Sequence, residues 1–307
     1  MTISPLAGIG STGLSPVTGV GGAGLSASPA SAYEGPLDLV PGAVVAYSVR
    51  ALSASLLGQN IFRLRRTSDD AEMDFAADAT TGEAPVASIT TFLGGNEGRI
   101  VTWYDQSGNN SHLTQSTKSV QPVYNSSGPN SKPTFICDGS DQNFMQSSGN
   151  VSCVNPAFTW FTIGKIRLPI FDIGQVIWCL GTTTANYAYV IDQTSSADLL
   201  LAASETNSGV EAIARTFNLV SAGNYRSLDG KFQFGSGNAK EDGVDLTEAA
   251  DGDVAPIDTL TQPILIAKEI NGAYSDGEWS ELIIYNAFKS DPDRTLVRGN
   301  EETYFNL

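Results

Sequence analysis

Beyond residue 43, hydrophobic positions along this 307-residue chain change from a helical to an alternating period. Val45, Val49, Leu52 and Leu56 lie three or four positions apart, which places them on one face of an α-helix. The spacing therefore predicts an amphipathic helix over residues 44–57, ended by Gly58.

Short alternating segments separated by Gly, Asn, Ser and Asp dominate the rest of the chain, which is typical of strands and turns. Two further helices are predicted, at residues 85–93 and 292–304, the second with Ser290 as N-cap and Pro292 in its first turn. Many strands with few helices indicate an all-β sandwich or jelly roll with two sheets packed face to face. The predicted strands are 61–66, 72–75, 98–104, 134–137, 158–163, 176–180, 187–191, 199–202, 231–234, 264–268 and 281–285.

Residues 1–32 have a different composition, because they carry no charged side chain and half of them are Gly, Ser or Pro. Such a segment cannot form a core of its own. We expect an extended arm that docks on a partner through single aliphatic side chains; the other interpretation is a flexible leader. With a linker at residues 34–41, the predicted domains are an anchoring arm and linker (1–42) and a β-sandwich (43–307). The predicted docking residues are Ile3, Leu6, Ile9, Leu14, Val17, Val20 and Leu25.

The charge balance narrows the possible partners. With 17 basic and 33 acidic side chains the formal charge is −16, which argues against nucleic acid as a partner. A single histidine, His112, disfavours most zinc sites and a Ser/His or Cys/His catalytic centre. Cys137, Cys153 and Cys179 cannot all pair within the chain, and neither a signal peptide nor a transmembrane segment is predicted. We expect buried thiols in a protein assembled inside a cell, without membrane insertion.

Three segments carry a resemblance to known proteins: AYSVRALSASLLGQNIFRLRRTSDDAEMDF (46–75), VTWYDQSGNNSHLTQ with KPTFICDGSDQNFM (101–115 and 132–145), and EWSELIIYNAFKSDPDRTLVRGNEETYF (278–305). Together they resemble the concanavalin A-like (laminin-G-like) jelly rolls of bacteriophage virion proteins. The first two also resemble the catalytic domain of fungal-type α-L-arabinofuranosidases.

The resemblance implies a concanavalin A-like sandwich and leaves three functions open. The favoured one is a virion protein (head fibre, capsid decoration or tail-fibre component), assembled in the host cytoplasm and not an enzyme. Its arm, residues 1–40, would bind capsid or tail proteins, and the domain would form a homotrimer and bind surface glycans. The alternatives are a glycoside hydrolase of arabinofuranosidase type and a cell-surface lectin.

The densest polar cluster follows the predicted strand 98–104. Tyr104, Asp105 and Asn109 are candidates to hold a sugar hydroxyl, and the oxygens of Asp105 and Asn109 also suit Ca²⁺. Asp105 can instead hydrogen-bond the backbone of its own loop, and this structural role is the favoured one. Asp138 and Asp141 are a weaker calcium candidate, so no cofactor is expected beyond a possible calcium ion. The acidic run between Asp242 and Asp258 is expected to be a solvated loop.

A retaining glycosidase needs two carboxyl groups about 5–5.5 Å apart. None of the available carboxylates stands in a recognisable hydrolase motif, so no catalytic residue is assigned. Trp103, Trp160, Trp178 and Trp279 are expected in the core rather than as exposed sugar platforms. The carboxylates considered are Asp105, Asp138, Asp172, Asp192, Glu269 and Glu281.

Overall fold

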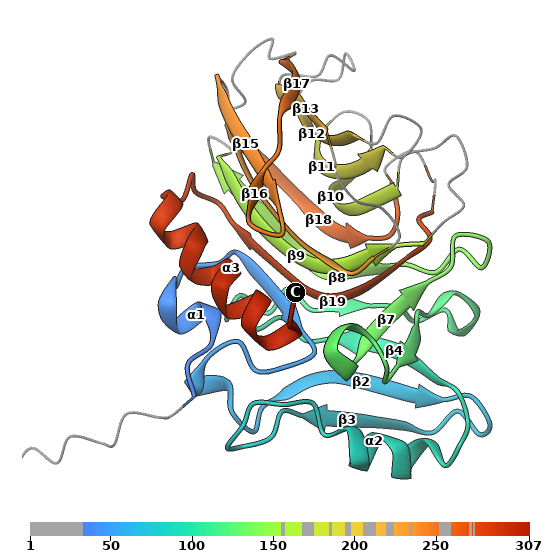
Figure 1. Cartoon of the computed structure of the whole chain (residues 1–307). Helices are drawn as coiled ribbons and strands as arrows, with labels where there is room; N and C mark the ends of the chain where they lie inside the picture. Colours follow the sequence, from blue (N-terminus) through green and yellow to red (C-terminus); the bar gives the residue numbers. More distant parts are fainter. Residues whose placement is uncertain are drawn as a thin grey trace, which may run out of the picture. The chain divides into compact units, whose positions relative to one another are not determined.

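The computed structural model describes one folded unit that begins at Tyr33 (Figure 1). The described residues are 33–154, 157–167, 175–183, 186–193, 198–204, 213–218, 224–233, 235–251, 259–269, 272 and 274–307. Its elements are α1 (Pro36–Leu39), β1 (Val45–Ser48), η1 (Ala54–Leu56), β2 (Asn60–Arg66), β3 (Glu72–Ala76), α2 (Val86–Leu93), β4 (Gly98–Trp103), β5 (Leu113–Thr114), η2 (Lys118–Val120), β6 (Val123–Asn125), η3 (Pro129–Ser131), β7 (Thr134–Cys137), β8 (Met145–Val154), β9 (Phe158–Ile166), β10 (Gln175–Thr183), β11 (Asn186–Gln193), β12 (Asp198–Ser204), β13 (Ile213–Asn218), β14 (Arg226–Gln233), β15 (Ser236–Glu241), β16 (Val244–Asp245), β17 (Glu248–Asp251), β18 (Thr259–Ile266), β19 (Gly277–Tyr285) and α3 (Asp291–Phe305).

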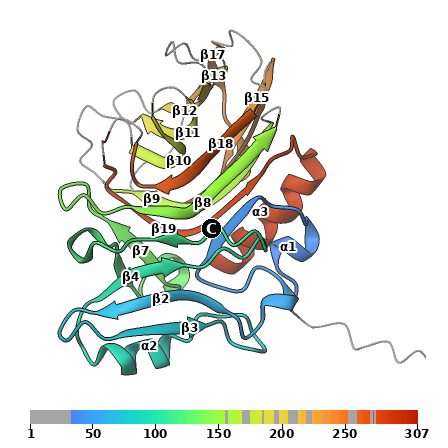
Figure 2. The same cartoon turned by 180° about the vertical axis from the view of Figure 1, so that it is seen from behind.

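The strands form three connected antiparallel sheets. The central sheet has the order β1-β19-β9-β14-β15-β16, and the upper sheet β8-β18-β10-β11-β12-β13-β17. The lower sheet, β3-β2-β4-β6-β7, joins the central sheet where β7 pairs with β19 (Figures 1 and 2). The all-β sandwich class predicted from the sequence is therefore confirmed.

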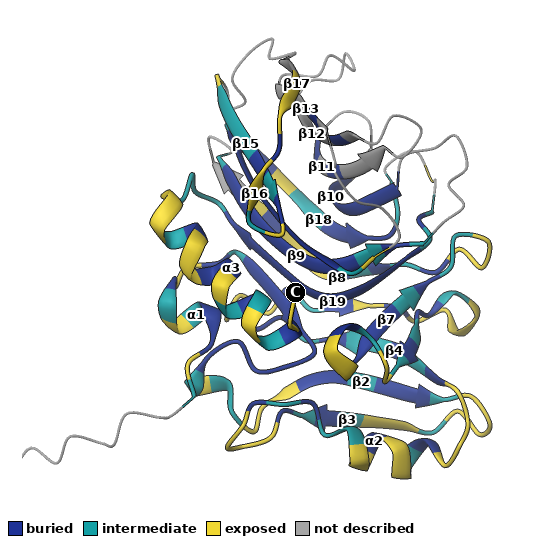
Figure 3. Cartoon of the chain, viewed as in Figure 1, coloured by how far each residue is buried: buried dark blue, intermediate teal, exposed yellow. Residues whose placement is uncertain are grey.

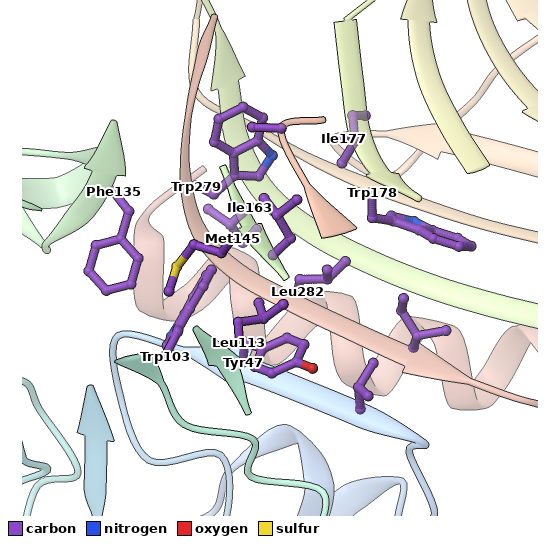
Figure 4. Packing of buried hydrophobic residues seen from close by; sticks show 14 of the residues in the cluster. Tyr47, Trp103, Leu113, Phe135, Met145, Ile163, Ile177, Trp178, Trp279 and Leu282 are labelled. Carbon is purple, nitrogen blue, oxygen red and sulfur yellow. The ribbon is translucent and has the colours of Figure 1, made fainter. Parts of the chain in front are cut away.

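The core lies between these sheets. Phe158 of β9 faces Trp178 of β10, with ring centroids 6.0 Å apart, and this contact fills the space between the central and upper sheets. Tyr47 of β1 meets Trp103 of β4 at 5.8 Å, so the lower sheet closes on the same core (Figure 4). Side chains along β9 and β19 are almost all buried, because both faces of the central sheet are covered (Figure 3).

Helices α1 and α3 cover the outer face of the central sheet. Val297 of α3 packs with Phe161 and Tyr285, and Arg294 donates from Nε to Asp229 Oδ2 at 2.7 Å. Ser290 accepts the Asp293 N–H as the N-cap, as predicted, because its side chain satisfies a donor that has no partner within the helix. The C-terminal helix and the helix at 85–93 are both confirmed.

Two local predictions at the start of the domain differ from the structure. Residues 44–57 are not a helix: Val45–Ser48 form strand β1, whose four side chains are all buried, and a 3-10 turn follows at Ala54–Leu56. When both faces of a strand are buried, apolar positions three or four apart do not distinguish it from a helix. The predicted linker at 34–41 contains α1, held to the domain by the Leu37 N–H bond to Leu52 O.

The division into an anchoring arm and a domain stays a prediction. The proposed docking residues between Ile3 and Leu25 all lie outside the described residues. Within the described ranges, no helix is both long and apolar enough to cross a membrane.

Candidate functional site

Asp105 holds together the loop that follows β4. Its Oδ1 accepts the N–H groups of Ala46 and Ser107 at 3.0 Å each, and its Oδ2 accepts the hydroxyl of Ser107 and the N–H of Ser111. Both oxygens are thereby used inside the protein, and the residue is 9% exposed. Asp105 thus hydrogen-bonds the backbone of its own loop, which is the role that the sequence favours.

The other two glycan candidates have different environments. Asn109 donates from Nδ2 to Val44 O at 3.0 Å, and Tyr104 donates its hydroxyl to Asp74 at 2.6 Å. Tyr104 and Asp105 line a pocket of about 590 Å³, whereas Asn109 is not among its lining residues. Glycan binding by these three residues stays a prediction.

A second polar cluster lies where β7 ends and β19 begins. Gly277 pairs with Cys137 and Glu278 with Ile136, so the next residues outward, Asp276 and Asp138, lie opposite each other. The two strands stay close beyond this point, because a Cβ added to Gly139 would come within 3.0 Å of the carbonyl oxygen of Tyr274. Opposed residues of antiparallel strands have Cβ atoms about 4.5–5.5 Å apart and project to the same face. The register thus brings two carboxyl groups together.

The environments of this pair move their pKa values in opposite directions. The pKa of Asp138 is lowered, chiefly because its Oδ1 accepts the hydroxyl of Ser140 at 2.6 Å. The pKa of Asp276 is raised, chiefly by burial and in addition by the negative charges of Asp138 and Glu278. Neighbouring carboxyl groups with diverging pKa values are suited to separate acid and base roles.

Arg167 and Tyr225 complete the cluster. Arg167 places Nη1 3.5 Å from Asp276 Oδ1 and Nε 3.9 Å from Glu278 Oε1. Tyr225 donates its hydroxyl to Glu278 Oε2 at 2.5 Å. Glu278 is therefore held by its neighbours, while Asp276 Oδ1 has no hydrogen bond among the described residues.

Sequence reasoning found one member of this pair. Asp138 was considered both as a carboxylate for a glycosidase and as a weak calcium ligand, but Asp276 was missed. Each aspartate precedes a glycine, Asp138 directly after β7 and Asp276 directly before β19. Asp-Gly also occurs at 229–230, 242–243 and 251–252, so this dipeptide does not single out the pair, and only the strand register brings the two together.

The remaining carboxylate candidates do not form such a pair at an accessible position. Glu281 is bound to Arg50 and lies beside Glu301, but both glutamates are fully buried, and Glu269 is half-buried. Asp172 lies outside the described residues, and for Asp192 only the backbone in β11 is described. Asp242, Asp245 and Glu248 of the predicted acidic loop are exposed, as expected, but the segment is not a loop throughout, because Asp245 lies in β16 and Glu248 in β17.

No group of three or more His, Cys, Asp or Glu side chains among the described residues is arranged to hold a metal ion. Asp141 is exposed, and calcium at Asp138 and Asp141 stays a prediction. The four tryptophans are at most 2% exposed and belong to the core, as predicted, and Cys137 and Cys179 are also buried.

Comparisons with known proteins place these features in context. Residues 40–135 match the family model for the catalytic domain of α-L-arabinofuranosidase B. Comparison with curated protein sequences gives no match.

Solved structures extend the likeness to most of the domain. An arabinofuranosidase complexed with arabinofuranosyl-α-1,2-xylobiose superposes with a TM-score of 0.62 at 16% identity, covering 87% of this chain. A GH54 α-L-arabinofuranosidase soaked with a cyclic sulfate inhibitor gives a TM-score of 0.61 at 16% identity and the same 87%. This chain covers 64% of the length of each of those chains. At this identity the likeness establishes the fold.

These findings correct the favoured functional prediction. A non-enzymatic bacteriophage virion protein was expected, but the matched family is a catalytic domain and the two structures described above are arabinofuranosidases. The segments on which the prediction rested resemble both classes, so they could not distinguish them. The structure does not test three further predictions: docking to capsid or tail proteins, a homotrimer, and a virion location. The chain is similar, over its first sandwich strands, to the catalytic domain of α-L-arabinofuranosidase B.

Proposed function

We propose that this protein is a glycoside hydrolase of arabinofuranosidase type, with Asp276 and Asp138 as its two carboxyl groups. The observation that carries the assignment of residues is their direct opposition across the β7–β19 pairing, combined with opposite pKa shifts. Support for the substrate class comes from the family match over residues 40–135.

Asp276 is assigned as the general acid. A carboxyl group with a raised pKa stays protonated at a pH at which its neighbour is ionised, and only the protonated form can protonate a leaving group. Asp276 meets this condition because burial and two nearby carboxylates disfavour its charged form. Arg167 acts against this shift and limits it.

Asp138 is assigned as the nucleophile. Its lowered pKa keeps it ionised, and the Ser140 hydroxyl and N–H both bind Oδ1 and orient the carboxylate. The Cβ separation expected for opposed strand residues is compatible with the carboxyl spacing of about 5–5.5 Å in retaining glycosidases. The expected stereochemical outcome is therefore retention.

The reaction then follows in two steps. Asp276 gives its proton to the glycosidic oxygen while the bond from that oxygen to the anomeric carbon breaks, and Asp138 bonds to the anomeric carbon as an ester. Asp276, now a carboxylate, takes a proton from water, and the water oxygen displaces Asp138 from the anomeric carbon. Asp276 is protonated and Asp138 ionised again at the end of the cycle.

The test is hydrolysis of 4-nitrophenyl α-L-arabinofuranoside by the wild type and by Asp138→Asn and Asp276→Asn. Asp138→Asn is expected to lose about 10²–10⁴-fold in kcat/KM, because the first step needs the nucleophile. Asp276→Asn is expected to lose about 10²–10⁴-fold in kcat, because 4-nitrophenolate leaves without protonation but water in the second step needs a general base. Asp141→Asn, an exposed aspartate three residues from Asp138, is the matched control and is expected to retain wild-type activity.

Azide and product stereochemistry separate the two roles. Azide is expected to restore turnover in Asp138→Ala with the inverted glycosyl azide, and in Asp276→Ala with the retained one. Folded variants within twofold of the wild type would overturn the assignment of residues. A folded wild type that does not hydrolyse this substrate or α-1,2-, α-1,3- and α-1,5-linked arabinofuranosides would overturn the proposed function.

A further inference from the structure

The 590 Å³ pocket is separate from the carboxylate pair. It lies between the α1–β1 connection, the η1–β2 segment and the loop after β4, and it shares no lining residue with the cluster around Asp276. Its volume is in the range of pockets that enclose small ligands. We propose that this pocket is a binding site for a neutral saccharide, independent of the hydrolytic site.

The walls of the pocket are held rigidly before any ligand arrives. Gln106 accepts the Leu52 N–H on Oε1 at 2.9 Å and donates from Nε2 to Arg50 O at 2.8 Å. Asp105 ties the same loop to Ala46 and Ser111. A preformed wall lowers the conformational entropy lost on binding, which favours recognition of a small ligand.

The charges in the pocket exclude anions. No Lys or Arg is among its described lining residues, and its charged side chains are the carboxylates of Asp38 and Asp105. Phosphate, sulfate or a sugar acid would meet these negative charges without a cation to bind it.

A cation fits no better, because both carboxylates already serve the backbone. Asp38 Oδ2 accepts the N–H groups of Gly35 and Ala54 at 2.9 and 2.7 Å, and Asp105 accepts on both oxygens. A cation would have to compete with these N–H donors at Asp105 and at Asp38 Oδ2, which leaves one carboxylate oxygen for an ion such as Ca²⁺ that takes six to eight oxygen ligands. The charges of the lining therefore favour an uncharged ligand.

The polar groups on the lining suit hydroxyl groups. Gln59 and Asn60 are exposed at the start of β2, and each side-chain amide can donate and accept. His112 accepts the Asp105 N–H on Nδ1 at 3.0 Å, which places its ring proton on Nε2 as a donor. Leu37 and Leu56 supply apolar lining for the C–H face of a sugar ring. Amides, an imidazole donor and aliphatic surface together match the alternating hydroxyl and C–H groups of a saccharide.

His112 also provides the test, because it is the single histidine of the chain and lines this pocket. We would record the imidazole C–H resonances of the full chain by NMR while adding L-arabinose or xylobiose, and sodium sulfate separately. The expected result is a saturable shift of the His112 signals with at least one saccharide at millimolar concentration and no saturable shift with sulfate. This readout does not depend on hydrolysis, so the binding test remains decisive even if the protein does not hydrolyse arabinofuranosides.

The double variant Gln59→Ala/Asn60→Ala is expected to weaken the saccharide response at least tenfold. Asn150→Ala removes an exposed amide from β8, away from the pocket lining, and is the matched control expected to keep the response. Ser55→Trp, at an exposed lining position, is expected to abolish the response by filling the pocket. No saturable response with either saccharide, a saturable response to sulfate, or an unchanged saccharide response in the folded double variant would each overturn the proposal.

Discussion

Arg50 and Glu281 form a buried, two-point ion pair that joins β1 to β19. Arg50 donates from Nε to Glu281 Oε2 at 3.0 Å and from Nη2 to Oε1 at 3.1 Å, and the Ser48 hydroxyl donates to Oε2 at 2.6 Å. Both side chains are at most 3% exposed. Glu281, one of the carboxylates considered for catalysis, therefore serves the fold.

Removing one partner of this pair should be costly. Glu281→Ala leaves the Arg50 guanidinium buried without its counter-charge, and such losses reach about 3–5 kcal/mol in the free energy of unfolding. Urea unfolding followed by tryptophan fluorescence measures the change. Asp74→Ala removes the partner of Arg63 in a pair with side chains 39% and 30% exposed, and it should cost no more than about 1 kcal/mol. Equal costs for the two variants would contradict the structural role of Glu281.

Glu301 should make stability fall with rising pH. Burial, followed by the charge of Glu281, raises its pKa well above the ordinary value, and the Glu281 carboxyl group lies close enough to favour the protonated form of Glu301. The folded-state pKa lies above the unfolded one, so the stability that Glu301 contributes is complete below the unfolded pKa and is lost as pH rises through the folded pKa.

Glu301→Gln removes this titration while keeping the shape of the side chain. The variant is expected to lose less stability than the wild type between mildly acidic and alkaline pH, as measured by urea midpoints across that range. Glu302→Gln is the neighbouring control on α3. The carboxyl group of Glu302 is less buried; burial raises its pKa, and the positive charge of Arg298 opposes that rise. Parallel pH profiles for Glu301→Gln and the wild type would refute this role.

Asp105→Ala should destabilise the fold more than it affects catalysis. Its carboxylate satisfies the N–H groups of Ala46, Ser107 and Ser111, and leaving such donors unpaired costs about 1–3 kcal/mol each when they stay buried. We expect a loss of about 3 kcal/mol in the free energy of unfolding, measured in urea. Asp141→Ala, which removes an exposed carboxylate, should be neutral. Unchanged stability of Asp105→Ala would show that the loop does not depend on this residue.

The pH profile of hydrolysis should depend on Arg167. In the proposed mechanism the alkaline limb of kcat/KM reports loss of the proton from Asp276, whose pKa Arg167 lowers. Arg167→Met is therefore expected to move the alkaline limb to higher pH, because the ionised form of Asp276 loses a favourable charge. Arg63→Met, in a partly exposed pair on β2, should leave the limb unchanged. A limb that stays in place in Arg167→Met would argue against Asp276 as the titrating acid.

Strand positions followed from alternation or apolar runs in much of the chain, but strands without a clear pattern were missed, among them the ten-residue β8. β2, β4 and β7 lie within a residue or so of their predictions because each alternates or is bounded by clear turns. β1 was mistaken for a helix, since Val45 and Tyr47 are buried in the main core on one face of the strand and Ala46 is buried in the cluster against α1 on the other. β5 is two residues long and carries no periodicity that a sequence can reveal.

The sequence by itself determined the all-β class, the C-terminal helix and the burial of the tryptophans, because these depend on periodicity, capping and hydrophobicity within short windows. Only the tertiary structure decided which carboxylates stand together. Asp138 and Asp276 are far apart along the chain and become neighbours because β7 pairs with the start of β19 in one particular register. The pKa shifts that distinguish them also arise from burial and neighbouring charges, which exist only once the sheets have assembled.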